Sequence, residues 1–166
     1  HKGSGLRFVV GHGGGSYPHV PASKYQTHLG LINEESYLGI AYVQDAASRL
    51  NRIVVGSLLE EGERAISVQP SAAAVAKDGR IVSWDLRALK MMLELDLVPV
   101  PYGDVCMDQA RGCSILSTEE VFRYLANELR PSRILIGSDV DGVYDKDPRK
   151  YDNAKKIPLI TSENFT

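Results

Sequence analysis

The chain has 166 residues, enough for one domain with a hydrophobic core, and its 43% hydrophobic and 24% charged content is ordinary for a globular protein. Its net charge of −2 gives no electrostatic reason to expect a nucleic acid or an anionic membrane as partner, and no apolar run approaches the roughly 20 residues that span a bilayer. Cys106 and Cys113 fit neither a disulfide framework nor a metal site by number or spacing, so we expect reduced thiols in a cytoplasmic protein.

Strand-like and helix-like segments alternate along the chain, which predicts an α/β protein with a mainly parallel sheet. Residues 6–10 read LRFVV and predict a buried strand that leads into a glycine-rich loop at residues 11–16. Asn33 is a suitable N-cap for a long helix whose apolar residues recur at intervals of three and four before Gly62 ends it. Residues 65–68 predict the next strand.

The second half of the chain continues this alternation. Asp78 and Gly79 predict a turn, and Asp85 can cap a short helix. Ser117 and Glu120 form a possible capping box for a further helix. Additional strands are predicted at residues 97–100, near an edge because of a proline, at residues 133–137, and at an edge at residues 157–160. No repeat or interdomain linker interrupts this order, so we expect a single domain over residues 1–166.

Three consecutive glycines, Gly13 to Gly15, follow the first predicted strand. Without Cβ atoms, their backbone N–H groups can approach an anion closely. The pattern is neither a Walker A loop nor a GxGxxG fingerprint, so a tight turn without a ligand is the alternative. His19 favours the phosphate interpretation, because an imidazolium can donate to a phosphate oxygen and stabilise charge during transfer. His12 fits equally well as a structural hydrogen-bonding residue.

A second polar loop begins at Ser138, directly after the predicted strand at residues 133–137. Ligands of open α/β sheets bind beyond the carboxyl ends of strands. Asp139 and Asp141 can orient Mg²⁺ or a lysine near phosphates there, and Gly142 allows the main chain to approach closely. A plain Asp-Gly turn is the alternative. Two loops suited to phosphate, both at strand ends, favour phosphate chemistry.

Together these segments resemble the amino acid kinase superfamily. Residues 10–19, VGHGGGSYPH, are similar to the family loop of the form hGGGSFGH, and residues 138–144, SDVDGVY, with the Asp-Pro at 147–148, are similar to its nucleotide loop. Residues 68–71, VQPS, and 98–105, VPVPYGDV, resemble segments of the isopentenyl phosphate kinases. With the histidine after the glycine loop, they point to these enzymes and to the related fosfomycin kinases.

The resemblance implies a three-layer αβα sandwich, usually a homodimer, that transfers the γ-phosphate of ATP to isopentenyl phosphate with Mg²⁺. The residues implied at the acceptor phosphate are Gly13, Gly14, Gly15, His19, Ser117 and Thr118. Leu38 and Ile40 are implied to line the pocket for the isopentenyl tail, with plain core positions as the alternative. The nucleotide side is implied to comprise Asp139, Asp141, Gly142, Val143, Tyr144, Lys146, Asp147 and Pro148. His19 and Asp139 are the implied catalytic residues.

The sequence departs from the family pattern at several points. The family's opening KxGGS motif and its later lysine segment are not found, so we expect this chain to be part of a longer protein and to be inactive by itself, because phosphoryl transfer depends on electrostatic positioning. Residues 117–120 read STEE where the family often has SGDD, and Pro18 replaces a common glycine. A kinase for another small phosphate or phosphonate, such as fosfomycin, and a non-catalytic ligand-binding protein of the same fold are the alternatives.

Overall fold

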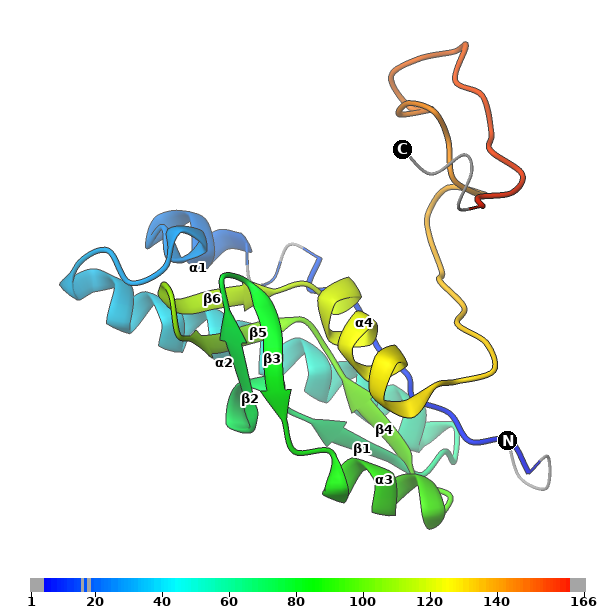
Figure 1. Ribbon diagram of the computed structural model, residues 1–166, viewed down its shortest axis with the longest axis horizontal. Coiled ribbons are helices and arrows are strands. Elements are labelled where there is room, and N and C mark those ends of the chain that lie inside the picture. Colours follow the sequence, from blue (N-terminus) through cyan, green and yellow to red (C-terminus); the bar gives the residue numbers. More distant parts are fainter. Residues whose placement is uncertain (1–4, 16, 18, 162–166) are drawn as a thin grey trace. The chain divides into compact units, whose positions relative to one another are not determined.

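The computed structural model describes residues 5–15, 17 and 19–161, and for residues 19–21 it describes the main chain alone. The chain divides into two units, His1–Arg130 and Pro131–Thr166. Within the described residues, all helices and strands belong to the first unit (Figure 1). None of the described helices combines the length and the hydropathy that crossing a membrane requires. A single domain over the whole chain remains a prediction.

Helices and strands alternate in the first unit, and this alternation confirms the α/β class. The helices are α1 (His19–Lys24), η1 (Thr27–Leu29), α2 (Glu34–Glu60), η2 (Pro70–Ala72), α3 (Arg87–Glu94) and α4 (Thr118–Leu129). The strands are β1 (Ala65–Val68), β2 (Ala74–Lys77), β3 (Arg80–Trp84), β4 (Val98–Pro101), β5 (Asp104–Asp108) and β6 (Gly112–Leu116).

Parallel pairing joins the strands that are distant in sequence, and hairpins join those that are adjacent. β1 pairs with β4 in parallel, with Ala65 opposite Val98. The four other strands lie in the order β3-β2-β5-β6, in which β2 and β5 are parallel while β2–β3 and β5–β6 are antiparallel hairpins. Asp78 and Gly79 form the predicted turn between β2 and β3, with φ of 51° and 76°, as expected for a two-residue hairpin loop.

Helices cover both faces of the strands, as a three-layer sandwich requires. Val105 on β5 belongs to a core cluster with Val43 of α2. Its neighbour Cys106 belongs to a different cluster, with Leu89 of α3 and Val121 of α4. Because successive side chains of a strand point to opposite faces, α2 lies on one face and α3 and α4 on the other (Figure 1). The predicted αβα arrangement is therefore confirmed.

Local chemistry sets the start of α2 as predicted. Asn33 Oδ1 accepts a hydrogen bond from the Ser36 N–H at 3.0 Å, and Ser36 Oγ accepts one from the Asn33 N–H at 3.3 Å. This reciprocal pair satisfies two donors that a helix start otherwise leaves unpaired. The residues of α2 that are fully buried are Ser36, Gly39, Val43, Ala47, Asn51 and Val55.

The predicted strand at residues 6–10 is wrong for its first half. Residues 5–8 are exposed and carry no strand. Only the end of the segment lies beside β4, where the Val10 N–H donates to the Pro99 carbonyl at 3.1 Å and His12 forms a parallel bridge with Tyr102. Pro99 and Pro101 have no N–H to return to this segment, so a continuous ladder cannot form.

The predicted strands at residues 133–137 and 157–160 are also wrong. Residues 133–137 carry no strand in the structure. An apolar run becomes a strand only when a partner supplies its hydrogen bonds. Near residues 157–160 the structure has an isolated bridge between Tyr144 and Lys156 and a hydrogen bond from the Ile157 N–H to the Val143 carbonyl, and residues 157–160 carry no strand.

We expect Gly30→Ala to destabilise the protein by about 2–4 kcal/mol. Gly30 has φ of 95°, and a Cβ there would lie 2.6 Å from the main-chain oxygen of Arg111. The variant therefore combines an unfavourable backbone conformation with a clash that no side-chain movement relieves. Urea unfolding measures the change. Gly56→Ala is the control, because Gly56 is within α2 and a Cβ there meets nothing within 4 Å. Equal stability of Gly30→Ala and wild type would contradict this account.

Candidate functional site

The glycine loop lies against β4 and α4. The His12 main chain bridges to Tyr102, the residue that follows β4, and the two side-chain rings stack with centroids 5.6 Å apart. Gly11 leaves no room for a side chain, because a Cβ there would lie 2.1 Å from Cε2 of Phe122 on α4. The absence of a side chain at Gly11 therefore allows the loop to approach the helix closely.

A hydrogen bond connects this loop to the start of α4. Thr118 Oγ1 donates to the His12 carbonyl at 2.7 Å. Ser117 is the N-cap of α4, and its Oγ accepts from the Glu120 N–H at 3.2 Å. A helix N-terminus carries partial positive charge and free N–H groups. The structure thus brings the start of α4 to the glycine loop, while binding of an acceptor phosphate by Ser117 and Thr118 stays a prediction.

The glycines of the loop are accessible to an anion. Gly13 and Gly15 are exposed, and Gly14 is half-buried. The Gly14 carbonyl accepts from the Tyr17 N–H at 3.2 Å, and Gly15 has φ of 52°, so the chain turns sharply here. Pro18 and the side chain of His19 lie outside the described residues. The contact of His19 with a phosphate therefore stays a prediction.

The two residues predicted for an isopentenyl tail do not lie together. Ile40 is half-buried and packs against the cluster of Ala22, Val43 and Val105. It therefore occupies a core position, which was the alternative prediction for this residue. Leu38 is 53% exposed. Residues two apart on a helix do not face each other, so a pocket lined by both remains a prediction.

Asn51 is part of the site, and its role was not apparent from the sequence. It is a buried polar residue in the sheet-facing stripe of α2. Its Nδ2 lies 3.1 Å from His12 Nε2 and 3.2 Å from the Val100 carbonyl oxygen. Its Oδ1 is buried without a hydrogen-bond partner among the described residues. The sequence signal for Asn51 was its position, four residues after Ala47 and four before Val55, which puts a polar side chain between apolar ones on the buried stripe of α2.

In the second unit, Asp141 organises the predicted nucleotide loop. It accepts a hydrogen bond from the Tyr144 hydroxyl at 2.6 Å and pairs with Lys156 at 2.9 Å. These hydrogen bonds, from Tyr144 first and then from Lys156, lower the pKa of Asp141. A Cβ on Gly142 would lie 2.5 Å from Lys156 Cε. Glycine at position 142 therefore leaves room for the lysine that pairs with Asp141.

The other predicted nucleotide residues belong to the same small unit. Asp139 forms an ion pair with Arg149, and Asp147 Oδ1 accepts from the Arg149 N–H at 3.0 Å. Lys146 Nζ lies over the Tyr151 ring, 5.5 Å from its centroid. Val143 is exposed and Pro148 is half-buried. The unit thus gathers carboxylates and cationic groups on one short segment, and cationic side chains of this kind can pair with phosphates. Among the described residues, no group of three or more His, Cys, Asp and Glu side chains is placed to hold a metal ion.

The model of the amino acid kinase family matches residues 1–166. The chain belongs to the amino acid kinase family. It is 37% identical over 160 residues to an isopentenyl phosphate kinase of Methanothermobacter thermautotrophicus, covering 93% of this chain and 60% of that enzyme. It is 39% identical over 142 residues to an isopentenyl phosphate kinase of Methanocaldococcus jannaschii, covering 83% of this chain and 53% of the relative.

A solved structure of an isopentenyl phosphate kinase superposes with a TM-score of 0.89 at 36% identity, covering 94% of this chain and 65% of the other. This chain therefore spans somewhat less than two thirds of the length of the relatives it matches. The likeness confirms the amino acid kinase fold predicted from the sequence.

Asp104 connects the two segments that resemble VQPS and YGDV in this member of the family. It is only 1% exposed, and its carboxylate accepts from the Ser71 N–H at 3.1 Å and from the Val105 N–H at 2.9 Å. Burial raises the pKa of Asp104, and the hydrogen bonds from Ser71 oppose this rise. The carboxylate therefore fixes the loop after β1 beside the start of β5. Both segments were recognised in the sequence, but the contact between them was not predicted.

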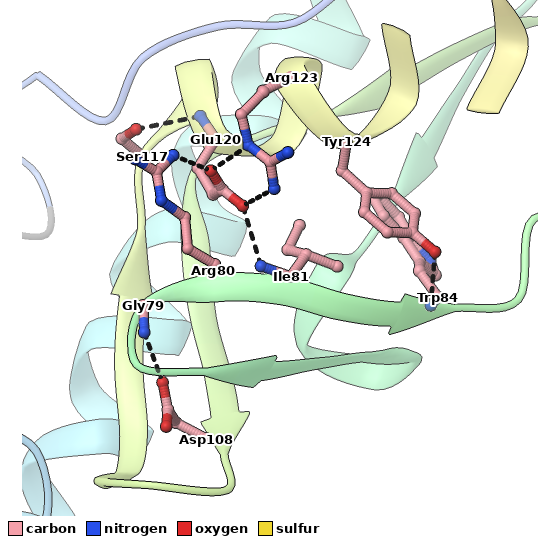
Figure 2. A network of polar contacts seen from close by, with 9 residues as sticks. All are labelled: Gly79, Arg80, Ile81, Trp84, Asp108, Ser117, Glu120, Arg123 and Tyr124. Carbon is pink, nitrogen blue, oxygen red and sulfur yellow. Dashed lines mark hydrogen bonds and ion pairs between the residues drawn. The ribbon is translucent and has the colours of Figure 1, made fainter. Parts of the chain in front are cut away.

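Glu120 anchors α4 to β3. Figure 2 shows its carboxylate accepting from the Ile81 N–H at 2.8 Å and pairing with Arg80 and Arg123 at 2.7 Å. The Arg123 guanidinium, with the Ile81 N–H and Arg80, lowers the pKa of Glu120 from 4.5 to about 2, against the opposing effect of burial. The predicted capping box is confirmed only on the Ser117 side, because the Glu120 carboxylate is used by β3 and Arg123.

Proposed function

We propose that the protein containing this chain transfers the γ-phosphate of ATP to isopentenyl phosphate, giving isopentenyl diphosphate. The hydrogen bond between Thr118 Oγ1 and the His12 carbonyl carries the proposal, because it joins an exposed glycine loop to the N-terminus of α4. Both elements bind anions through main-chain N–H groups. The names of the two relatives and of the solved structure described above, each an isopentenyl phosphate kinase, support the choice of acceptor.

In this proposal the two sets of residues have different tasks. Gly13, Gly14 and Gly15 bind the acceptor phosphate, and His19 donates to it as charge develops during transfer. The residues of the second unit, with Asp139 and Asp141, serve the nucleotide and its metal ion. Mg²⁺, when bound, neutralises charge on the phosphates of ATP. The protein's part is to position two anions and to stabilise the charge that forms between them.

Three further features belong to this proposal. The resemblance to the family supports a homodimer. The match of the family model to residues 1–166 supports a single domain. A cytoplasmic location is supported by two free, buried thiols. In the β5–β6 register, Cys113 pairs with Met107, the residue after Cys106, so the two thiols point to opposite faces.

Phosphoryl transfer by the full-length gene product tests the function. The purified protein is incubated with ATP, Mg²⁺ and isopentenyl phosphate, and ³¹P NMR follows the appearance of a diphosphate together with ADP. Reactions without acceptor correct for ATP hydrolysis. Fosfomycin and other small phosphates form the substrate panel. Formation of isopentenyl diphosphate with the highest kcat/KM of the panel is expected. Preference for fosfomycin, or no transfer to any acceptor, would overturn the proposal.

A further inference from the structure

Buried side chains hold the His12 ring in place. It stacks on Tyr102, with ring centroids 5.6 Å apart and planes 6° from parallel. Its Nδ1 lies 3.0 Å from the Gly13 carbonyl oxygen, and its Nε2 lies 3.1 Å from Asn51 Nδ2. Tyr102 and Asn51 are each 1% exposed. The ring therefore connects two buried side chains to the exposed glycine loop.

Asn51 determines which ring nitrogen of His12 carries the proton. Asn51 Nδ2 also lies 3.2 Å from the Val100 carbonyl oxygen, and a carbonyl can only accept. The amide must therefore turn its NH₂ group toward Val100, and its second hydrogen is donated to His12 Nε2. A ring nitrogen that accepts a hydrogen bond carries no proton. The proton of the neutral ring is then on Nδ1, from which it is donated to the Gly13 oxygen.

The hydrogen bond to Gly13 sets the direction of one N–H in the loop. The peptide bonds of the described chain are trans, so the carbonyl and the N–H of each peptide group point in opposite directions. Because the Gly13 carbonyl points to the His12 ring, the Gly14 N–H points away from it. A peptide group between two glycines flips at little intrinsic cost, since neither residue has a Cβ. The selection between its two orientations must come from another residue.

We propose that His12 is a positioning residue that holds the Gly14 N–H outward to receive the acceptor phosphate, with Asn51 fixing the tautomer that makes this possible. Thr118 Oγ1 holds the His12 carbonyl at the same time, so the residue is anchored at both its main chain and its ring. The inference rests on the proposed function only in that a phosphate binds at this loop.

NMR of the full-length gene product labelled with ¹⁵N tests the tautomer directly. We expect His12 Nδ1 to show the chemical shift of a protonated ring nitrogen and Nε2 that of an unprotonated one. Asn51→Leu keeps an apolar stripe on α2 and removes the donor, so a mixture of tautomers is expected in that variant. A native ring protonated on Nε2, or a tautomer unchanged by Asn51→Leu, would overturn the proposal.

Substitutions of His12 test its effect on phosphate. In His12→Gln the side-chain oxygen can replace Nε2 as acceptor but leaves no donor for Gly13. We expect the KM for isopentenyl phosphate to rise about 10- to 100-fold, the effect of losing one hydrogen bond to a charged group, while the KM for ATP stays within about twofold of wild type. In His12→Asn the side-chain NH₂ lies near the place of Nδ1, so most of the loss should be recovered.

His28→Gln is the matched control, because His28 is an exposed histidine outside the loop. It should leave both KM values unchanged. Equal acceptor KM in His12→Gln and wild type, or equal increases in the KM for ATP and for acceptor, would overturn the positioning role.

Inorganic phosphate separates this inference from the proposed function. Titration of wild type with phosphate should shift the amide signal of Gly14, and the shift should require a higher phosphate concentration in His12→Gln. If isopentenyl phosphate is not phosphorylated while the tautomer and the Gly14 response are as expected, the proposed function fails and the positioning role stands. If the Gly14 amide does not respond in wild type, the positioning role fails.

Discussion

Replacing Glu120 by alanine is expected to lower the free energy of unfolding by about 2–3 kcal/mol at pH 7. The variant removes the acceptor of the Ile81 N–H, the ion pair with Arg80 on β3 and the ion pair with Arg123 within α4 (Figure 2). Arg80 and Arg123 are exposed enough to return to water, so the loss is smaller than for a fully buried pair. Urea unfolding followed by circular dichroism measures the change.

A pH series distinguishes the charge of Glu120 from its hydrogen bond. Because its pKa is lowered from 4.5 to about 2 in the folded protein, the contribution of the charge is complete above pH 4.5 and is lost as the pH falls toward 2. Glu120→Gln removes the charge and keeps an acceptor for Ile81, so the difference in stability from wild type should be constant from pH 7 to pH 4.5 and should shrink as the pH falls from 4.5 toward 2. A difference that widens in acid would contradict this explanation.

Glu119→Gln is the control for the position on the helix. Glu119 is exposed on the same first turn of α4, so only the interaction with the helix dipole is lost, which is worth about 0.3–1 kcal/mol. An effect of Glu119→Gln as large as that of Glu120→Ala would show that the first turn tolerates no change and that the contacts of Glu120 with β3 are not the cause.

His19→Ala in the full-length gene product is expected to cost about 2–4 kcal/mol of transition-state stabilisation, the effect of removing one preorganised donor. This corresponds to a decrease of about 30- to 1,000-fold in kcat/KM for isopentenyl phosphate. The prediction rests on the resemblance of residues 10–19 to the family loop, because the His19 side chain lies outside the described residues. Steady-state kinetics with the acceptor as the varied substrate provide the measurement.

The kinetic constants of His19→Ala identify the step that is affected. If His19 acts on charge that develops during transfer, kcat should fall and the KM for ATP should stay the same. His28→Ala is the control, because His28 is an exposed histidine that the loop motif does not include. An unchanged kcat/KM in His19→Ala would remove His19 from the mechanism, whatever the acceptor of the enzyme is.

Elements that depend on a few neighbouring residues were predicted well. Asn33 begins α2 and Ser117 caps α4 through hydrogen bonds within four residues, and Asp78 and Gly79 turn between β2 and β3 with the backbone angles that their residue types favour. The Asp108 carboxylate, which accepts from both turn N–H groups, adds a distant contact to that turn. Local signals of this kind are complete in the sequence itself. The same holds for the motif order that placed the chain in its family.

Elements that depend on a distant partner were predicted poorly. Residues 6–8 have strand-like composition but carry no strand, and residues 10–12 reach β4 where its two prolines supply no donors. Residues 133–137 are equally apolar and have no partner strand among the described residues. In the site, the contacts of Asn51 with His12 and of Asp104 with Ser71 span more than 30 positions. Periodicity and capping rules concern residues that are close in sequence, so they cannot predict such pairs. The loops of the site were therefore predicted from the sequence, but the side chains that hold them were not.

The prolines of β4 have a consequence for association between molecules. A strand whose prolines alternate with other residues can donate hydrogen bonds toward one side only, and in β4 that side faces β1. A foreign strand that displaced the segment at residues 9–12 would find carbonyl groups but no N–H donors at Pro99 and Pro101. The edge that guides the glycine loop is therefore also protected against aggregation by strand addition.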